Sequence, residues 1–207
     1  MKNIAWVRIL IVVLAGLACN TVFAQEEKDN CKRLAERKVR KMIKAGFEFS
    51  SEKHLIKRCT NMFEKEQAMG GEGQKPYVVI EVTSKHKDQE IAVDLMRFKL
   101  PVELASWISN EIRQMIESEL VQSTTYWELG GHDYFLEVQQ AIDEVAIATA
   151  LNLTPVETIY EAKRQHNKNY EYRVGLIYDR EKMMSLFIFE ASQYEILDSI
   201  YWLNKSN

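Results

Sequence analysis

The sequence has few of the residue patterns that catalysis or cofactor binding requires. Its four histidines, His54, His86, His132 and His166, stand far apart without a partner at zinc-ligand spacing, which predicts a surface position for each. The glycine-rich stretch 70–73 lacks the preceding strand and following lysine of a phosphate-binding loop and is interpreted as a linker. Gly-x-Ser-x-Gly and Cys-x-x-Cys patterns are also missing. The sequence therefore predicts no enzyme, with no catalytic residue, metal or cofactor.

Long apolar runs are missing as well. The run Ile9–Leu17 is followed by small residues and the pattern Val22-Phe23-Ala24, which is typical of a secretory signal cleaved after Ala24. A membrane span needs roughly 20 apolar residues, more than this run supplies. Two alternatives stay open, a transmembrane anchor and lipidation at Cys19, although Gly16 stands where a lipoprotein signal carries a branched apolar residue. We expect an exported protein, periplasmic or associated with the outer membrane.

Cysteine is scarce, with three residues in the chain. After cleavage only Cys31 and Cys59 remain, in a compartment where thiols tend to oxidise. An internal disulfide between them is one interpretation. Free buried thiols and an intermolecular bridge are the alternatives.

Basic residues gather near the start of the mature chain. Removal of residues 1–24 changes the formal net charge from −3 to −5, yet residues 26–69 carry 12 Lys or Arg against 8 Asp or Glu. Residues 70–207 carry 13 against 22. The sequence thus predicts a basic helical arm over residues 25–69 and an acidic domain over 70–207.

The sequence of the arm predicts two helices. One covers residues 28–45 and stops at Gly46, and the other runs to about Gln67 with Ser50 or Ser51 as its cap. The first helix is amphipathic. Its basic candidates for an anionic partner or a membrane surface are Arg33, Arg37, Arg40, Lys41 and Lys44. The alternative is a solvated helix whose charges pair with the acidic domain, while export and net acidity argue against nucleic acid.

The sequence of the acidic domain predicts an α+β fold with its elements in the order strand, helix, helix, strand, strand, helix. The expected elements are strand 77–83, helix 88–122, helix 133–151, strands 156–162 and 170–178, and helix 180–203. Pro101 either kinks the helix over 88–122, which we favour, or lies in the first turn of a new helix. The last two strands form a hairpin with a polar loop over 163–169, one face in the core and one in water. We expect a small three-stranded antiparallel sheet with helices packed on one face.

Two features of the domain suggest binding. Tyr126 and Trp127 stand beside a glycine pair in the loop 123–132, where they could form a platform for a glycan or peptide; the alternative is that they cap the core. The last helix displays an apolar face wider than one sheet usually covers, which favours contact with a second chain. Asp143 and Glu144, neighbours on a helix, do not share a face and are interpreted as solvated.

Three phrases of the chain, LAERKVRKMIKAGF, LASWISNEIRQMIE and LTPVETIYEAKRQHNKNYEYRVGLIYD, resemble the twenty-kilodalton LPP-type membrane-associated lipoprotein family and related exported bacterial proteins of unknown function. The resemblance is most specific at Pro155-Val156, Ile159-Tyr160 and the segment Tyr172–Tyr178. It implies an envelope component with an α+β domain and no known reaction. The chain departs from the family pattern at Pro101 and Trp107.

These observations together predict an exported, non-enzymatic envelope or periplasmic protein that acts by assembly or binding. The expected partners are a second copy, an envelope protein or a membrane surface. The alternative is a ligand-binding module that uses the Tyr126/Trp127 loop.

Overall fold

The computed structural model describes residues 27–68, 70, 75–122 and 131–198 of the 207-residue chain. The chain divides into two compact units, Met1–Gln67 and Ala68–Asn207. This boundary lies two residues before the one that the sequence predicts, at the start of the glycine-rich stretch.

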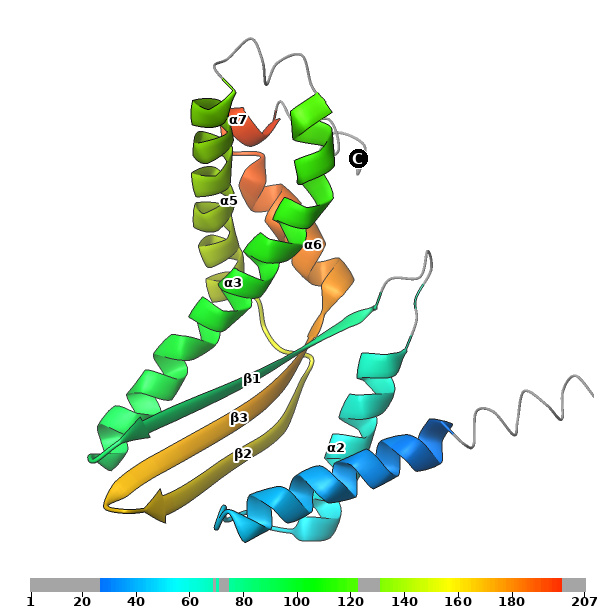
Figure 1. Cartoon of the computed structure of the whole chain (residues 1–207), viewed down its shortest axis with the longest axis vertical. Helices are drawn as coiled ribbons and strands as arrows, with labels where there is room; N and C mark the ends of the chain where they lie inside the picture. Colours follow the sequence, from blue (N-terminus) through cyan, green and yellow to red (C-terminus); the bar gives the residue numbers. More distant parts are fainter. Residues whose placement is uncertain (1–26, 69, 71–74, 123–130, 199–207) are drawn as a thin grey trace, which may run out of the picture. The chain divides into compact units, whose positions relative to one another are not determined.

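The described residues of the first unit form two helices, α1 over residues 27–44 and α2 over Glu52–Gln67 (Figure 1). Gly46 ends α1 in the left-handed conformation, with φ of 83°. Its amide N–H donates to the Ile43 carbonyl, and the Phe47 N–H donates to the Met42 carbonyl. This pair of bonds is the Schellman ending that glycine allows. At the start of α2, the Ser51 hydroxyl accepts from the His54 N–H at 3.4 Å, so Ser51 is the cap.

The second unit is built on a three-stranded antiparallel sheet in the order β1-β3-β2. The strands are β1 Tyr77–His86, β2 Glu157–His166 and β3 Asn169–Asp179. Strand β3 pairs with both neighbours, and the Val156 N–H donates to the Ile177 carbonyl at 2.8 Å at the start of the hairpin. The predicted hairpin and its pairing with the first strand are confirmed.

The predicted polar loop over residues 163–169 is wrong. Strand β2 continues to His166, which pairs with Asn169, so the turn holds two residues only. Asn167 and Lys168 have φ of 50° and 62°. Positive φ at both central residues is the turn whose twist matches a hairpin, and asparagine tolerates it without glycine.

The helices of this unit lie on one face of the sheet (Figure 1). They are α3 Gln89–Gln122, α5 His132–Asn152, α6 Arg180–Ala191 and α7 Glu195–Asp198. Pro101 lies within the single helix α3. Helix α3 runs alongside β1, β3 and α5, and α5 packs on α6. The predicted α+β class, with helices packed on one face of a three-stranded antiparallel sheet, is confirmed.

The last predicted helix, 180–203, is not continuous. Helix α6 ends at Ala191, and the Ser192 hydroxyl donates to the Phe189 carbonyl at 2.7 Å, which competes with helix continuation. The short α7 then begins at Glu195 and brings Leu197 into the core, where it is 1 % exposed. Residues 199–203 of the predicted helix lie outside the described residues.

The main core lies between the sheet and the helices. It includes Val78, Ile80, Val82, Leu104, Ile108, Ile112, Val138, Ile142, Val145, Val174, Leu176, Tyr178, Met183 and Phe187. The predicted alternation of β3 therefore holds, because Val174, Leu176 and Tyr178 share the face toward the helices.

The sequence predicted that the opposite face of the hairpin is exposed to water, and this prediction is wrong. Ile177, Ala162 and Tyr160 on that face are buried at 0 %, 2 % and 5 % exposure. The Tyr160 ring lies over Gly175, where an added Cβ would come within 2.8 Å of Cε1, and its hydroxyl donates to Glu81 Oε1 at 2.9 Å. One tyrosine thus crosses all three strands, and the close approach requires glycine.

Candidate functional site

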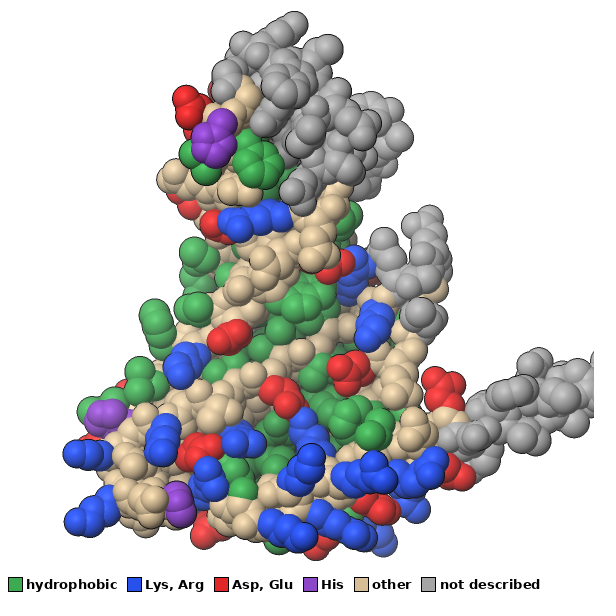
Figure 2. Space-filling model, in the orientation of Figure 1, with side chains coloured by type: hydrophobic (Ala, Val, Ile, Leu, Met, Phe, Trp, Pro, Cys, Tyr) green, Lys and Arg blue, Asp and Glu red, His purple; other side chains and the backbone are tan. Residues whose placement is uncertain are grey.

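The five basic candidates of the arm all lie on one exposed face of α1. Arg33, Arg37, Arg40, Lys41 and Lys44 are solvent-exposed. Their spacing of four, three, one and three residues keeps them within about 100° around the helix, and the eleven-residue span covers roughly 16 Å. We call these five residues the basic face. Figure 2 shows Lys and Arg side chains gathered along α1.

The basic face lies opposite the buried side of the same helix. Cys31, Ala35, Val39 and Met42 are at most 4 % exposed, and helical geometry places them about half a turn from the five cations. Within the described residues of the first unit, none of the five cations forms an ion pair or a side-chain hydrogen bond with another residue. The basic face therefore carries charge that no described acidic group of its own unit pairs with.

Contacts between α1 and α2 hold the basic helix in an antiparallel pair. The Cys31 thiol donates to Gln67 Oε1 at 3.2 Å. Nearer the turn, Lys38 Nζ lies 6.0 Å from the centre of the Phe63 ring, within the range of a cation–π contact. Met62 on α2 is also buried, at 1 % exposure.

Cys31 and Cys59 are both buried and neither is in a disulfide, so the internal disulfide is not formed in this structure. Cys31 lies beside Gln67, eight residues beyond Cys59 on α2, which corresponds to about 12 Å along the helix. A disulfide requires Cα atoms closer than about 7 Å. Burial, helped by the negative charges of Glu64 and Glu27, raises the pKa of the Cys31 thiol and keeps it protonated.

The predicted aromatic platform lies outside the described residues, because residues 123–130 include both Tyr126 and Trp127. His54, His132 and His166 are exposed and His86 is half-buried. No group of His, Cys, Asp or Glu side chains with metal-binding geometry occurs within the described ranges. Over those same ranges, no helix combines the length and apolar character needed to cross a membrane.

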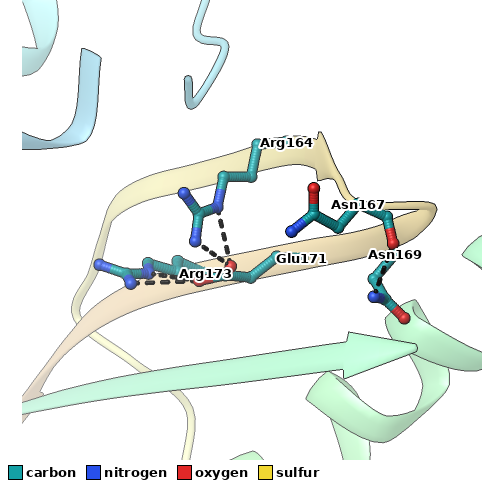
Figure 3. Close-up of polar contacts among 5 residues, drawn as sticks. All are labelled: Arg164, Asn167, Asn169, Glu171 and Arg173. Atoms are coloured by element: carbon teal, nitrogen blue, oxygen red, sulfur yellow. Dashed lines mark hydrogen bonds and ion pairs between the residues drawn. The ribbon is translucent and has the colours of Figure 1, made fainter. Parts of the chain in front are cut away.

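An ion cluster that the sequence did not predict lies at the hairpin end of the sheet (Figure 3). The Glu171 carboxylate accepts from Arg164 Nε at 2.7 Å and also from Arg164 Nη2, and it accepts from Arg173 Nε at 3.2 Å and Nη2 at 3.1 Å. Arg164 on β2 lies directly opposite Glu171 on β3. Arg173 follows Glu171 by two residues on β3, so both side chains lie on the same face of the sheet. The register of the two-residue turn brings the three side chains together.

Burial and pairing act in opposite directions on Glu171. Its side chain is 8 % exposed, and burial alone would raise the pKa of the carboxyl. The hydrogen bonds and positive charges of Arg164 and Arg173 outweigh burial and hold the pKa below its usual value. Glu171 therefore stays ionised at neutral pH with both guanidinium groups bound, which makes it a brace for the hairpin rather than a general acid.

A hollow of about 370 Å³ opens between α3 and α5. Its lining residues are Val102, Ala105, Ser106, Ser109, Asn110, Arg113, Asp143 and Ile147. Asp143, interpreted from the sequence as solvated, is 50 % exposed and also joins the two helices. Its Oδ1 accepts from the Ser109 hydroxyl, and its Oδ2 accepts from Arg113 Nη2 at 2.6 Å.

Large apolar side chains stand exposed beside this hollow. Phe98 and Val102 on α3 are 70 % and 51 % exposed, and Ile147 and Leu151 on α5 are 53 % and 67 % exposed. Figure 2 shows hydrophobic side chains at the surface along α3 and α5. We call these four residues the apolar ridge. The sequence placed its expected second-chain contact on the last helix, where Phe189 is 64 % exposed, and missed this surface. The sequence carried a signal for this surface, because the two apolar residues on each helix stand four positions apart and therefore share one side of the helix.

Scans of this chain against protein-family models, curated proteins and solved structures gave no match. The resemblance to the LPP-type lipoprotein family therefore stays a prediction.

Proposed function

We propose that this chain is an exported, non-enzymatic protein of the cell envelope that acts by binding, and that the basic face of α1 docks on anionic phospholipid headgroups. The observation that carries this proposal is the basic face itself. Five exposed cations share one side of a helix whose other side is buried.

The form of the surface favours a membrane over a small anionic ligand. The five cations lie on the exposed side of a single helix, whereas a small ligand is usually bound in a concave site. Long Lys and Arg side chains on one helical stripe suit a flat array of headgroups. The predicted secretory signal ends close before α1, so processing leaves this helix near the amino terminus of the exported chain.

The expected strength follows from the number of cations. Each Lys or Arg near an anionic bilayer contributes about 1 kcal/mol, so neutralising one residue lowers the partition coefficient about 5-fold. Neutralising all five lowers it by roughly three orders of magnitude or more. Because the charges are exposed, salt weakens the attraction.

Vesicle flotation of the purified chain tests the proposal. Vesicles of phosphatidylcholine with phosphatidylglycerol should bind the protein, and vesicles of phosphatidylcholine alone should not. The test variant combines Arg33→Gln, Arg37→Gln, Arg40→Gln, Lys41→Gln and Lys44→Gln.

The matched control removes the same amount of charge elsewhere. It combines the exposed positions Lys85→Gln, Lys87→Gln, Lys163→Gln, Lys168→Gln and Lys182→Gln. The proposal expects the test variant to stay in solution and the control to float with the anionic vesicles. Equal losses in both variants would mean that net charge alone governs binding, and the proposal would then be wrong.

A further inference from the structure

We infer that the apolar ridge and the hollow between α3 and α5 form a twofold interface between two copies of this chain, in which Phe98 of each copy fills the hollow of the other. This inference is independent of the basic face on α1. It rests on the shape and the charge of one surface.

The surface has complementary parts at a spacing that a twofold axis can use. Phe98, the most exposed member of the ridge, lies eleven residues before Ser109 in the hollow, about 16 Å along α3. An axis that crosses α3 midway, close to Val102, would place Phe98 of the partner subunit over Ser109. Val102, close to the axis, would then lie near its own counterpart, and every contact away from the axis would occur twice, as in an isologous interface.

The charge of the surface also suits a second copy. Arg113 and Asp143 are the charged residues that line the hollow, and they form an ion pair with each other at 2.6 Å. The centre of the surface is therefore close to electroneutral. An identical surface can approach it without like-charge repulsion at the centre, where charged residues are depleted in stable interfaces.

Arg113 gives the hollow an attraction for an aromatic ring. It lines the hollow, and its side chain is 34 % exposed while its Nη2 is bound to Asp143. The face of an aromatic ring attracts a guanidinium group. Phe98 of the partner subunit would supply that ring.

Sedimentation equilibrium of the purified chain tests the association. The wild type should be dimeric at micromolar concentration, and Phe98→Ala should raise the dissociation constant about 30-fold or more, as truncation of a central aromatic anchor does. The control is Phe189→Ala, which removes a comparably exposed ring from α6 and should leave the constant unchanged. Unchanged circular dichroism verifies that both variants are folded.

Cysteine cross-linking tests the register. Val102→Cys lies close to the proposed axis and should form a disulfide-linked dimer under mild oxidation, whereas Phe189→Cys should not. A wild-type monomer at high concentration would overturn the inference. A dimer that Phe98→Ala leaves intact, or that cross-links through position 189 instead of 102, would overturn it equally.

Discussion

Glu171→Gln should destabilise the second unit at neutral pH. The substitution keeps the size of the side chain but removes the charge that binds two guanidinium groups. Breaking a buried ion pair by removing one partner costs about 3–5 kcal/mol. Glu171 is 8 % exposed, but Arg164 and Arg173 are 20 % and 39 % exposed and recover part of their hydration. We therefore expect a loss of about 2–3 kcal/mol in the free energy of unfolding.

The loss should depend on pH in a defined direction. Pairing lowers the pKa of Glu171 in the folded chain below the ordinary value of a glutamate carboxyl. The unfolded chain thus binds more protons in that range, and the stabilisation by Glu171 is complete above the unfolded pKa and falls as pH drops through the folded pKa. The difference between wild type and Glu171→Gln should be largest near neutral pH and shrink in acid.

Urea unfolding at several pH values, followed by circular dichroism, measures this difference. Glu161→Gln on β2 is the control, because Glu161 is exposed and its substitution should change stability by less than about 0.5 kcal/mol. A double-mutant cycle with Arg164→Gln should show coupling of about 1 kcal/mol or more. Equal stability of wild type and Glu171→Gln at neutral pH would refute the assigned role.

Three further predictions follow from the same unit and the arm. Gly175→Ala should lower stability by about 1–3 kcal/mol in thermal unfolding, because its Cβ would meet the Tyr160 ring at 2.8 Å; a neutral effect would contradict the close approach. Burial raises the pKa of Tyr178 to about 12, so the stability that this residue contributes should decline as pH rises from about 10 to 12, and Tyr178→Phe should remove that decline. Cys31 and Cys59 should resist thiol reagents until the chain unfolds, and rapid labelling of the native chain would exclude their burial.

Much of the fold was predictable because its periodicities are local. The alternation of apolar and polar residues from Tyr170 to Tyr178 predicted which face of β3 is buried, and this face packs against the helices. Gly46 ends α1 as predicted, because glycine has no Cβ and adopts the positive φ of a helix end without steric cost. Pro101 did not split α3, and the helical period on both sides identified one long element.

What the sequence missed depends on contacts between distant residues. Asn167-Lys168 lacks the glycine that usually marks a two-residue turn, so the hairpin was predicted too short. Because the turn was predicted as a longer loop, the strand register that places Arg164 opposite Glu171 could not be predicted. Burial of Ile177 likewise contradicts a wet second face. Asp143 was read with its sequence neighbour, whereas its partners Ser109 and Arg113 lie on another helix.

Binding through the basic face of α1 can be measured as the partition of this chain onto phosphatidylglycerol-containing vesicles at increasing ionic strength. We predict strong binding at about 0.01 M salt, where the Debye length is roughly 30 Å, and release near 1 M, where it is roughly 3 Å. Binding that persists at high salt, or that is as strong on vesicles of phosphatidylcholine alone, would contradict it.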